Sequence, residues 1–141
     1  MDKSDWIWMP HAAHFILGTE CQFHLATYVN GYLISTVGEL WPDSRIRAIT
    51  ANAKGIQING RGDAWDADYM KKIGYAEIGY QRKYETMVFM AEPNYEHRCC
   101  PWRMANASEI DGQGYNDPSD ATDGHLALCE RYATKEAPAN A

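Results

Sequence analysis

The alternation of apolar and polar residues is clearest in Gln22–Glu39, where two runs rich in β-branched and aromatic residues flank Asn30-Gly31. Asn-Gly is typical of a two-residue type I′ turn, because both central residues of that turn need a positive φ. Such a turn sets the register of a β-hairpin, with Val29 opposite Tyr32 and Phe23 opposite Gly38. One face of the hairpin is the more apolar, and we expect that face to lie against the core. Its apolar residues are Phe23, Leu25, Val29, Tyr32 and Ile34.

The same kind of pattern predicts further strands at Arg45–Thr50, Tyr75–Tyr80 and Tyr84–Ala91. The last of these ends in five consecutive apolar residues, which is typical of a central strand that is covered on both faces. Met1–Glu20 shows no clean period, so we expect an extended segment packed on the sheet. Glu92–Gly114 contains prolines and glycines, and we expect it to be irregular.

Two segments have helical character. Asp63–Ile73 begins with acidic residues and ends with lysines before Gly74, an order that suits the helix dipole and a glycine cap. The second helix should begin with Asp117 or Ser119 as its N-cap and run to about Ala133. Its buried stripe is expected to contain Ala121, His125, Leu128, Cys129 and Tyr132.

These elements predict an α+β fold. We expect one globular domain over residues 1–133, made of an antiparallel sheet of about four to six strands with two helices, and a disordered tail over 134–141. A chain of 141 residues is long enough to bury a core without disulfides or a metal.

Composition and charge narrow the functional classes. The chain carries 19 acidic and 13 basic side chains, a net charge of −6, which argues against a protein that binds nucleic acid by neutralising phosphates. No segment has the pattern of a membrane span or a signal peptide, so we expect a cytosolic protein. In the cytosol its four cysteines should be thiols or metal ligands.

Cysteine and histidine give the sharpest chemical hypothesis. His125 and Cys129 are four residues apart on the final predicted helix, so their side chains leave the same face. His97, Cys99 and Cys100 lie in the irregular segment before that helix. Structural zinc takes four thiolate or imidazole ligands, and we predict a zinc site formed by Cys99, Cys100, His125 and Cys129. His97, and also Cys21, His11 and His14 if the N-terminus folds back, are further candidate ligands.

Two other interpretations of these residues stay open. Cys100 and Cys129 can be small buried side chains, with His125 a hydrogen-bonded histidine of the core. Alternatively, Cys99 or Cys100 is a catalytic nucleophile with His97 or His125 as its base, although no nucleophile elbow or oxyanion hole can be named.

Four segments give the chain a resemblance to known sequences: Thr27–Glu39 (TYVNGYLISTVGE), Tyr84–Phe89 (YETMVF), Cys99–Trp102 (CCPW) and Gly124–Arg131 (GHLALCER). In these segments the chain resembles a group of small uncharacterised proteins encoded by bacteriophages and prophages. The resemblance implies expression in the cytoplasm of a bacterial host. It carries no activity over to any residue.

Together these observations favour a phage accessory protein that acts by binding a host or phage protein, with a zinc ion as a candidate structural cofactor. Exposed aromatic residues such as Trp6, Trp8 or Trp102 are candidate anchors for the partner, because aromatic side chains dominate interface energetics. The alternatives are a small thiol- or metal-dependent enzyme that uses the cysteine and histidine cluster, and a component of the virion.

Overall fold

The computed structural model describes residues 1–14, 18–41, 78 and 82–138. Their helices and strands are a 3-10 turn η1 (Lys3–Asp5), β1 (Ile7–Met9), β2 (Cys21–Val29), β3 (Tyr32–Leu40), β4 (Tyr84–Pro93), β5 (Trp102–Met104), β6 (Asp111–Tyr115) and α4 (Pro118–Ala133).

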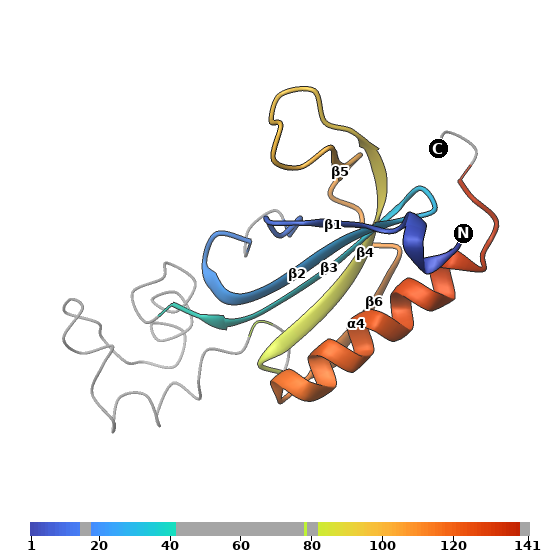
Figure 1. Ribbon diagram of the computed structural model, residues 1–141. Helices are drawn as coiled ribbons and strands as arrows, with labels where there is room; N and C mark the ends of the chain where they lie inside the picture. Colours follow the sequence, from blue (N-terminus) through green and yellow to red (C-terminus); the bar gives the residue numbers. More distant parts are fainter. Residues whose placement is uncertain (15–17, 42–77, 79–81, 139–141) are drawn as a thin grey trace, which may run out of the picture.

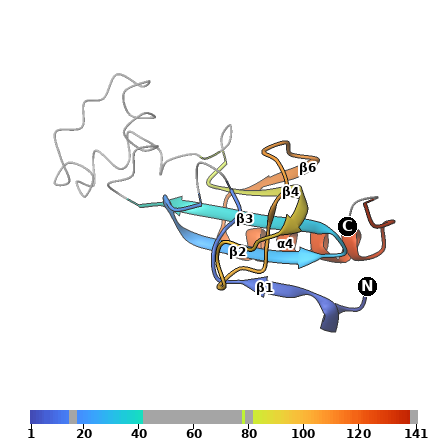
Figure 2. The same ribbon diagram turned by 90° about the horizontal axis from the view of Figure 1, so that it is seen from above.

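The strands form one curled antiparallel sheet in the order β1-β2-β3-β4-β5, and β6 also pairs with β4. β6 pairs with the first half of β4 and β5 with its last three residues, so β4 has neighbours along its whole length. Helix α4 crosses one face of the sheet (Figure 1). The same layering is visible from above (Figure 2). An α+β fold with an antiparallel sheet of this size is therefore confirmed.

The predicted hairpin is confirmed residue by residue. Val29 pairs with Tyr32 and Phe23 with Gly38, around a turn in which Asn30 has φ 54° and Gly31 has φ 88°. The Asn30 side chain also reaches the end of α4. Its Nδ2 donates to the carbonyl oxygens of Tyr132 at 3.2 Å and Lys135 at 2.7 Å, which ties the hairpin tip to the helix.

Helix α4 begins where its sequence predicts. Asp117 is the N-cap, and its Oδ1 accepts a hydrogen bond of 2.8 Å from the Asp120 backbone N–H. All five residues of the predicted stripe are buried against the sheet. Gly124 in α4 lies directly against the Tyr115 hydroxyl, so that a Cβ at this position would overlap it.

Both faces of the sheet are buried, whereas the hairpin pattern predicted burial of one face. On the helix side, Val29, Ile34 and Val88 pack against α4. On the other side, Ala26, Leu33, Phe89, Ala91, Met9 and Cys100 form a second cluster. The residues around β5 cover this helix-free face, and Trp102 stacks on Tyr28 with ring centroids 4.0 Å apart.

Two further expectations need correction. The prediction of two helices is not borne out, because the described residues contain α4 as their one α-helix, and Asp63–Ile73 lies outside them. Glu92–Gly114 is not wholly irregular, since it contains β5 and most of β6, both of which pair with β4. The strands expected at Arg45–Thr50 and over most of Tyr75–Tyr80 also fall outside the described residues.

Candidate metal centre

A hollow of about 670 Å³ opens on the helix-free side of the sheet. One wall comes from the segment 9–13 after β1, and the other from residues 92–107, which include the β4–β5 connection and β5. Met9, Trp102 and Met104 give the hollow an apolar lining. Cavities of this size with apolar walls and a few polar groups are where proteins commonly bind ligands.

His11, Cys99 and Cys100 meet on the wall of this hollow. Their ligand atoms all lie within 4.8 Å of one another, and Cys100 Sγ is 3.4 Å from His11 Nδ1. In a tetrahedral zinc site with bonds of about 2.3 Å to sulfur and about 2.0 Å to nitrogen, such a pair lies about 3.5 Å apart. The group could therefore hold a metal ion.

The three side chains differ in environment. Cys100 is 8% exposed and packs into the second core cluster, whereas His11 and Cys99 are exposed. Burial raises the pKa of the Cys100 thiol, and the neighbouring Cys99 adds to that effect. A metal ion would oppose this shift, because a thiol that coordinates an ion releases its proton to solvent and binds as the thiolate.

The structure separates the four ligands predicted from the sequence. Cys99 and Cys100 lie at the hollow, but His125 and Cys129 lie under α4, on the opposite side of the sheet. Both ring nitrogens of His125 are already used: Nε2 is 2.8 Å from Thr27 Oγ1, and Nδ1 is 2.7 Å from Thr36 Oγ1. His125 is thus a hydrogen-bonded histidine of the core.

A chain of hydroxyl groups continues from His125 across two strands. Thr36 Oγ1 is 2.6 Å from Thr86 Oγ1, and the Thr86 hydroxyl donates to the Tyr115 hydroxyl at 3.2 Å. Because each hydroxyl has one proton, Thr36 must donate to Thr86 and accept from His125. This assigns the proton of the neutral ring to Nδ1. Burial agrees with a neutral ring, since it lowers the pKa of His125 to about 4.

Neither of the two cysteines buried away from the hollow is suited to nucleophilic chemistry. Burial raises the pKa of Cys129 to about 12, and that of Cys21 likewise to about 12. A thiol reacts as its thiolate, which burial disfavours at both positions, so these two side chains fit a role in the core.

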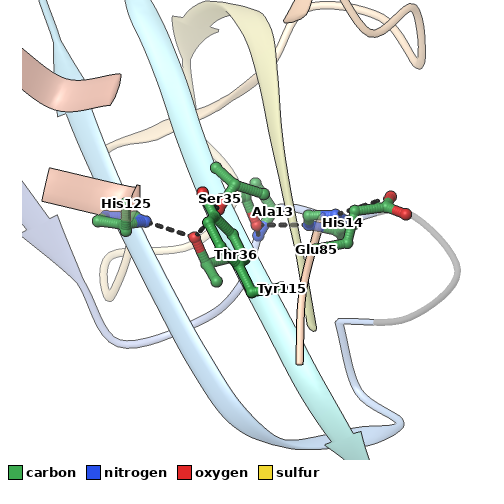
Figure 3. Close-up of polar contacts among 8 residues, drawn as sticks. Ala13, His14, Ser35, Thr36, Glu85, Tyr115 and His125 are labelled. Atoms are coloured by element: carbon green, nitrogen blue, oxygen red, sulfur yellow. Dashed lines mark hydrogen bonds and ion pairs between the residues drawn. The ribbon is translucent and has the colours of Figure 1, made fainter. Parts of the chain in front are cut away.

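A second buried histidine holds the segment that carries His11. Ser35 Oγ accepts a hydrogen bond of 3.2 Å from the Ala13 backbone N–H and lies 2.7 Å from His14 Nδ1. On the far side of the ring, Nε2 is 3.9 Å from Glu85 Oε1 (Figure 3). Ser35 is fully buried in a central strand, so it fixes the backbone from which His11 reaches Cys100.

His11 was only a conditional candidate in the sequence, because its role depends on the N-terminal segment folding back over the sheet. It does fold back: β1 pairs with β2, with Trp8 opposite Thr27. The sequence indicated this packing, because the irregular, partly apolar N-terminal segment was expected to lie on the sheet. What the sequence could not supply was the contact between residues that are 89 positions apart.

The candidate anchor residues also differ from expectation. Trp6 is 8% exposed and packs in the core under α4, so its prediction as an exposed aromatic was wrong. Trp102 is half-buried in its stack with Tyr28. Trp8 is exposed, and Tyr95, which the sequence did not single out, is 91% exposed.

Comparison with known proteins found no matching family model, no similar curated protein and no similar solved structure. Among the helices in the described part of the chain, none has the length and apolar character needed to cross a membrane.

Proposed function

We propose that this protein acts by binding another protein, that the hollow is its docking site, and that a zinc ion on His11, Cys99 and Cys100 stabilises the wall of that site. The observation that carries the proposal is the hollow itself, which combines an apolar lining with a cluster of thiol and imidazole groups.

Zinc suits this place because it would join two segments that are far apart in sequence. The segment after β1 and the β4–β5 connection are far apart in sequence and both lie over the helix-free face. Thiolate and imidazole are the ligands that zinc prefers, and a structural zinc contributes directly to folding free energy. An ion bonded to His11 and Cys100 would therefore hold the hollow in one shape.

A protein partner suits the surroundings of the hollow. Tyr95 follows the lining residue Asn94 and is almost fully exposed. A large exposed aromatic beside an apolar cavity is typical of an interface, because such a side chain buries a large area at low entropic cost. The net charge of −6 argues against nucleic acid as the partner.

The resemblance to phage-encoded proteins supports a partner in the cytoplasm of a bacterial host, of either host or phage origin. A place in the virion is the competing proposal. Mass spectrometry of purified particles separates the two, since an accessory protein should be absent from them and a structural component present in many copies.

The zinc part is tested by metal analysis of protein purified without chelator and without a nickel column. We expect about one zinc per chain, and less than about a tenth after His11→Ala or Cys100→Ala. His97→Ala is the matched control, since His97 lines the hollow but lies outside the cluster of ligand atoms. Wild-type protein with less than about a tenth of an equivalent would contradict the proposal.

The docking part is tested by filling the hollow. Ala107 is exposed and lines the hollow, while Ser108 is exposed and does not, so Ala107→Trp and Ser108→Trp add equal bulk at adjacent positions. In affinity capture from bacterial lysate, we expect a stoichiometric partner with wild type and Ser108→Trp and its loss with Ala107→Trp. Equal capture by both variants would place docking elsewhere.

A thiol enzyme is a second candidate, favoured by one observation: Cys100 Sγ lies 3.4 Å from the His11 ring, on the wall of a cavity. Its weakness is that burial raises the pKa of Cys100, which opposes formation of the thiolate. Iodoacetamide labelling at neutral pH discriminates. We expect Cys99 to label before Cys100, whereas an enzyme of this kind requires Cys100 to label faster than free cysteine.

A further inference from the structure

We propose that the ion at His11, Cys99 and Cys100 keeps one coordination position open toward the hollow, and that a thiolate carried by the docked partner fills it. The inference rests on the proposed zinc site and deepens it. In this proposal the ion has two roles: it stabilises the wall of the hollow, and it binds the partner directly.

The number of ligands is the first argument. Zinc in proteins is normally four-coordinate, and sites with three protein ligands hold water or an exogenous group in the fourth position. Over the described residues, the cluster contains His11, Cys99 and Cys100 and no fourth histidine, cysteine or carboxylate. His97 lines the same hollow, but its ring nitrogens lie outside the cluster.

The direction of the open position is the second argument. Cys100 lies on the core side, packed in the cluster with Leu33 and Phe89, while His11 and Cys99 are exposed. All three line the hollow. An ion among them has the core behind it, so its remaining position faces the cavity.

The lining selects the class of donor. Met9, Trp102 and Met104 present apolar, polarisable surface, next to which a strongly hydrated carboxylate or phosphate loses more hydration free energy than a thiolate does. Arg103, the cation on this wall, already forms ion pairs with Glu92 at 2.8 Å and Glu96 at 3.3 Å. A thiolate is weakly hydrated and binds soft sites strongly. On binding, the thiol releases its proton to solvent and its sulfur displaces water from the ion.

Cobalt substitution tests this directly, because the absorption of Co²⁺ reports both the number of ligands and the number of bonded sulfurs. The full chain is loaded with Co²⁺ in a buffer that contains a phosphine reductant, which keeps the cysteines reduced. It is then titrated with N-acetylcysteine amide, a small uncharged thiol. We expect saturable binding in which the sulfur-to-cobalt absorption rises by about half, as a third Co–S bond joins two. Ala107→Trp should bind Co²⁺ but lose this response, and Ser108→Trp should keep it.

Three results would overturn the inference, and they differ in what they say of the zinc site. An unchanged spectrum at saturating thiol means that the fourth position is closed. A His97→Ala variant with at least about tenfold weaker Co²⁺ binding identifies His97 as the fourth ligand and leaves the zinc proposal standing. Absence of Co²⁺ binding in wild type removes both proposals for the ion, while the capture experiment still tests docking.

Discussion

The two faces of the sheet each bury a histidine, and the two histidines are held differently. Under α4, both ring nitrogens of His125 have hydroxyl partners. On the helix-free face, His14 has Ser35 at one nitrogen, while its Nε2 and the nearby Glu85 Oε1 are buried without a hydrogen-bond partner in the described structure.

The two faces also differ in how they are closed. A buried polar network in which every member is paired rigidifies its surroundings, whereas an unpaired buried polar atom costs free energy. The helix face is closed by sixteen residues of regular helix. The other face is closed by short segments that leave the hollow open between them. The candidate chemistry lies on the second face.

The largest expected effect comes from deleting each ring in turn. His125→Ala leaves a cavity and removes two buried hydrogen bonds, those to Thr27 and Thr36, although Thr36 keeps its contact with Thr86. It should lower the free energy of unfolding by about 3–4 kcal/mol. His14→Ala also leaves a cavity but removes one hydrogen-bonded contact instead of two, and should lower it by about 2–3 kcal/mol. Urea denaturation measures both. Equal losses of unfolding free energy in the two variants would contradict the proposed difference between the faces.

Acid should lower the free energy of unfolding by nearly as much as His125→Ala does. Burial lowers the pKa of His125 from 6.5 to about 4, so the unfolded chain takes up this proton at higher pH than the folded one. The stability contributed by the neutral ring is therefore complete above pH 6.5 and is lost as the pH falls to about 4, with a total loss of about 3 kcal/mol. Denaturant titrations across this range, compared with His125→Gln, measure the effect. Parallel profiles for the two proteins would show that another group is responsible.

A smaller effect distinguishes two adjacent buried hydroxyls on β3. Ser35 holds the segment that carries His11, whereas Thr36 faces α4 and bonds to His125. Ser35→Ala and Thr36→Ala should each cost about 1–2 kcal/mol of stability. Only Ser35→Ala should also weaken zinc binding, by about tenfold, as is usual when a group that orients a ligand is lost. Competition with a chromophoric chelator gives the affinities. A similar loss of affinity in both variants would indicate general loosening.

The smallest effect concerns the start of α4. Asp117→Ala removes the side chain that caps the Asp120 N–H and should lower stability by about 1 kcal/mol. Metal affinity should stay within about twofold of wild type, because the cap belongs to α4, which covers the face of the sheet opposite the hollow. Ser119→Ala, at the other N-cap position considered from the sequence, should be close to neutral.

The sequence predicted those parts of the fold that depend on local rules. Asn30-Gly31 determined the hairpin register, and Asp117 marked the beginning of α4, because turn and cap chemistry involve neighbours in the chain. β5 and β6 were missed, since β5 has three residues and β6 contains two glycines, so their pairing is determined by β4 rather than by their own sequences.

The candidate site was predicted in part for the same reason. Cys99 and Cys100 were predicted as candidate ligands and do lie beside each other at the hollow, but their predicted partners were His125 and Cys129, whose helical spacing is a local signal. Packing decided otherwise, since the sheet lies between the two pairs. Helical spacing also could not show that Thr27 and Thr36 would occupy both nitrogens of His125.

The turn residue Asn30 has a consequence for which sequences this fold accepts. Glycine or aspartate could adopt its positive φ, yet neither has a side-chain N–H to give to the carbonyls of Tyr132 and Lys135. The choice of amide at the hairpin tip is thus dictated by a helix end about a hundred residues downstream. A designer who exchanges Asn30 for another good turn former would keep the loop and release the last turn of the helix.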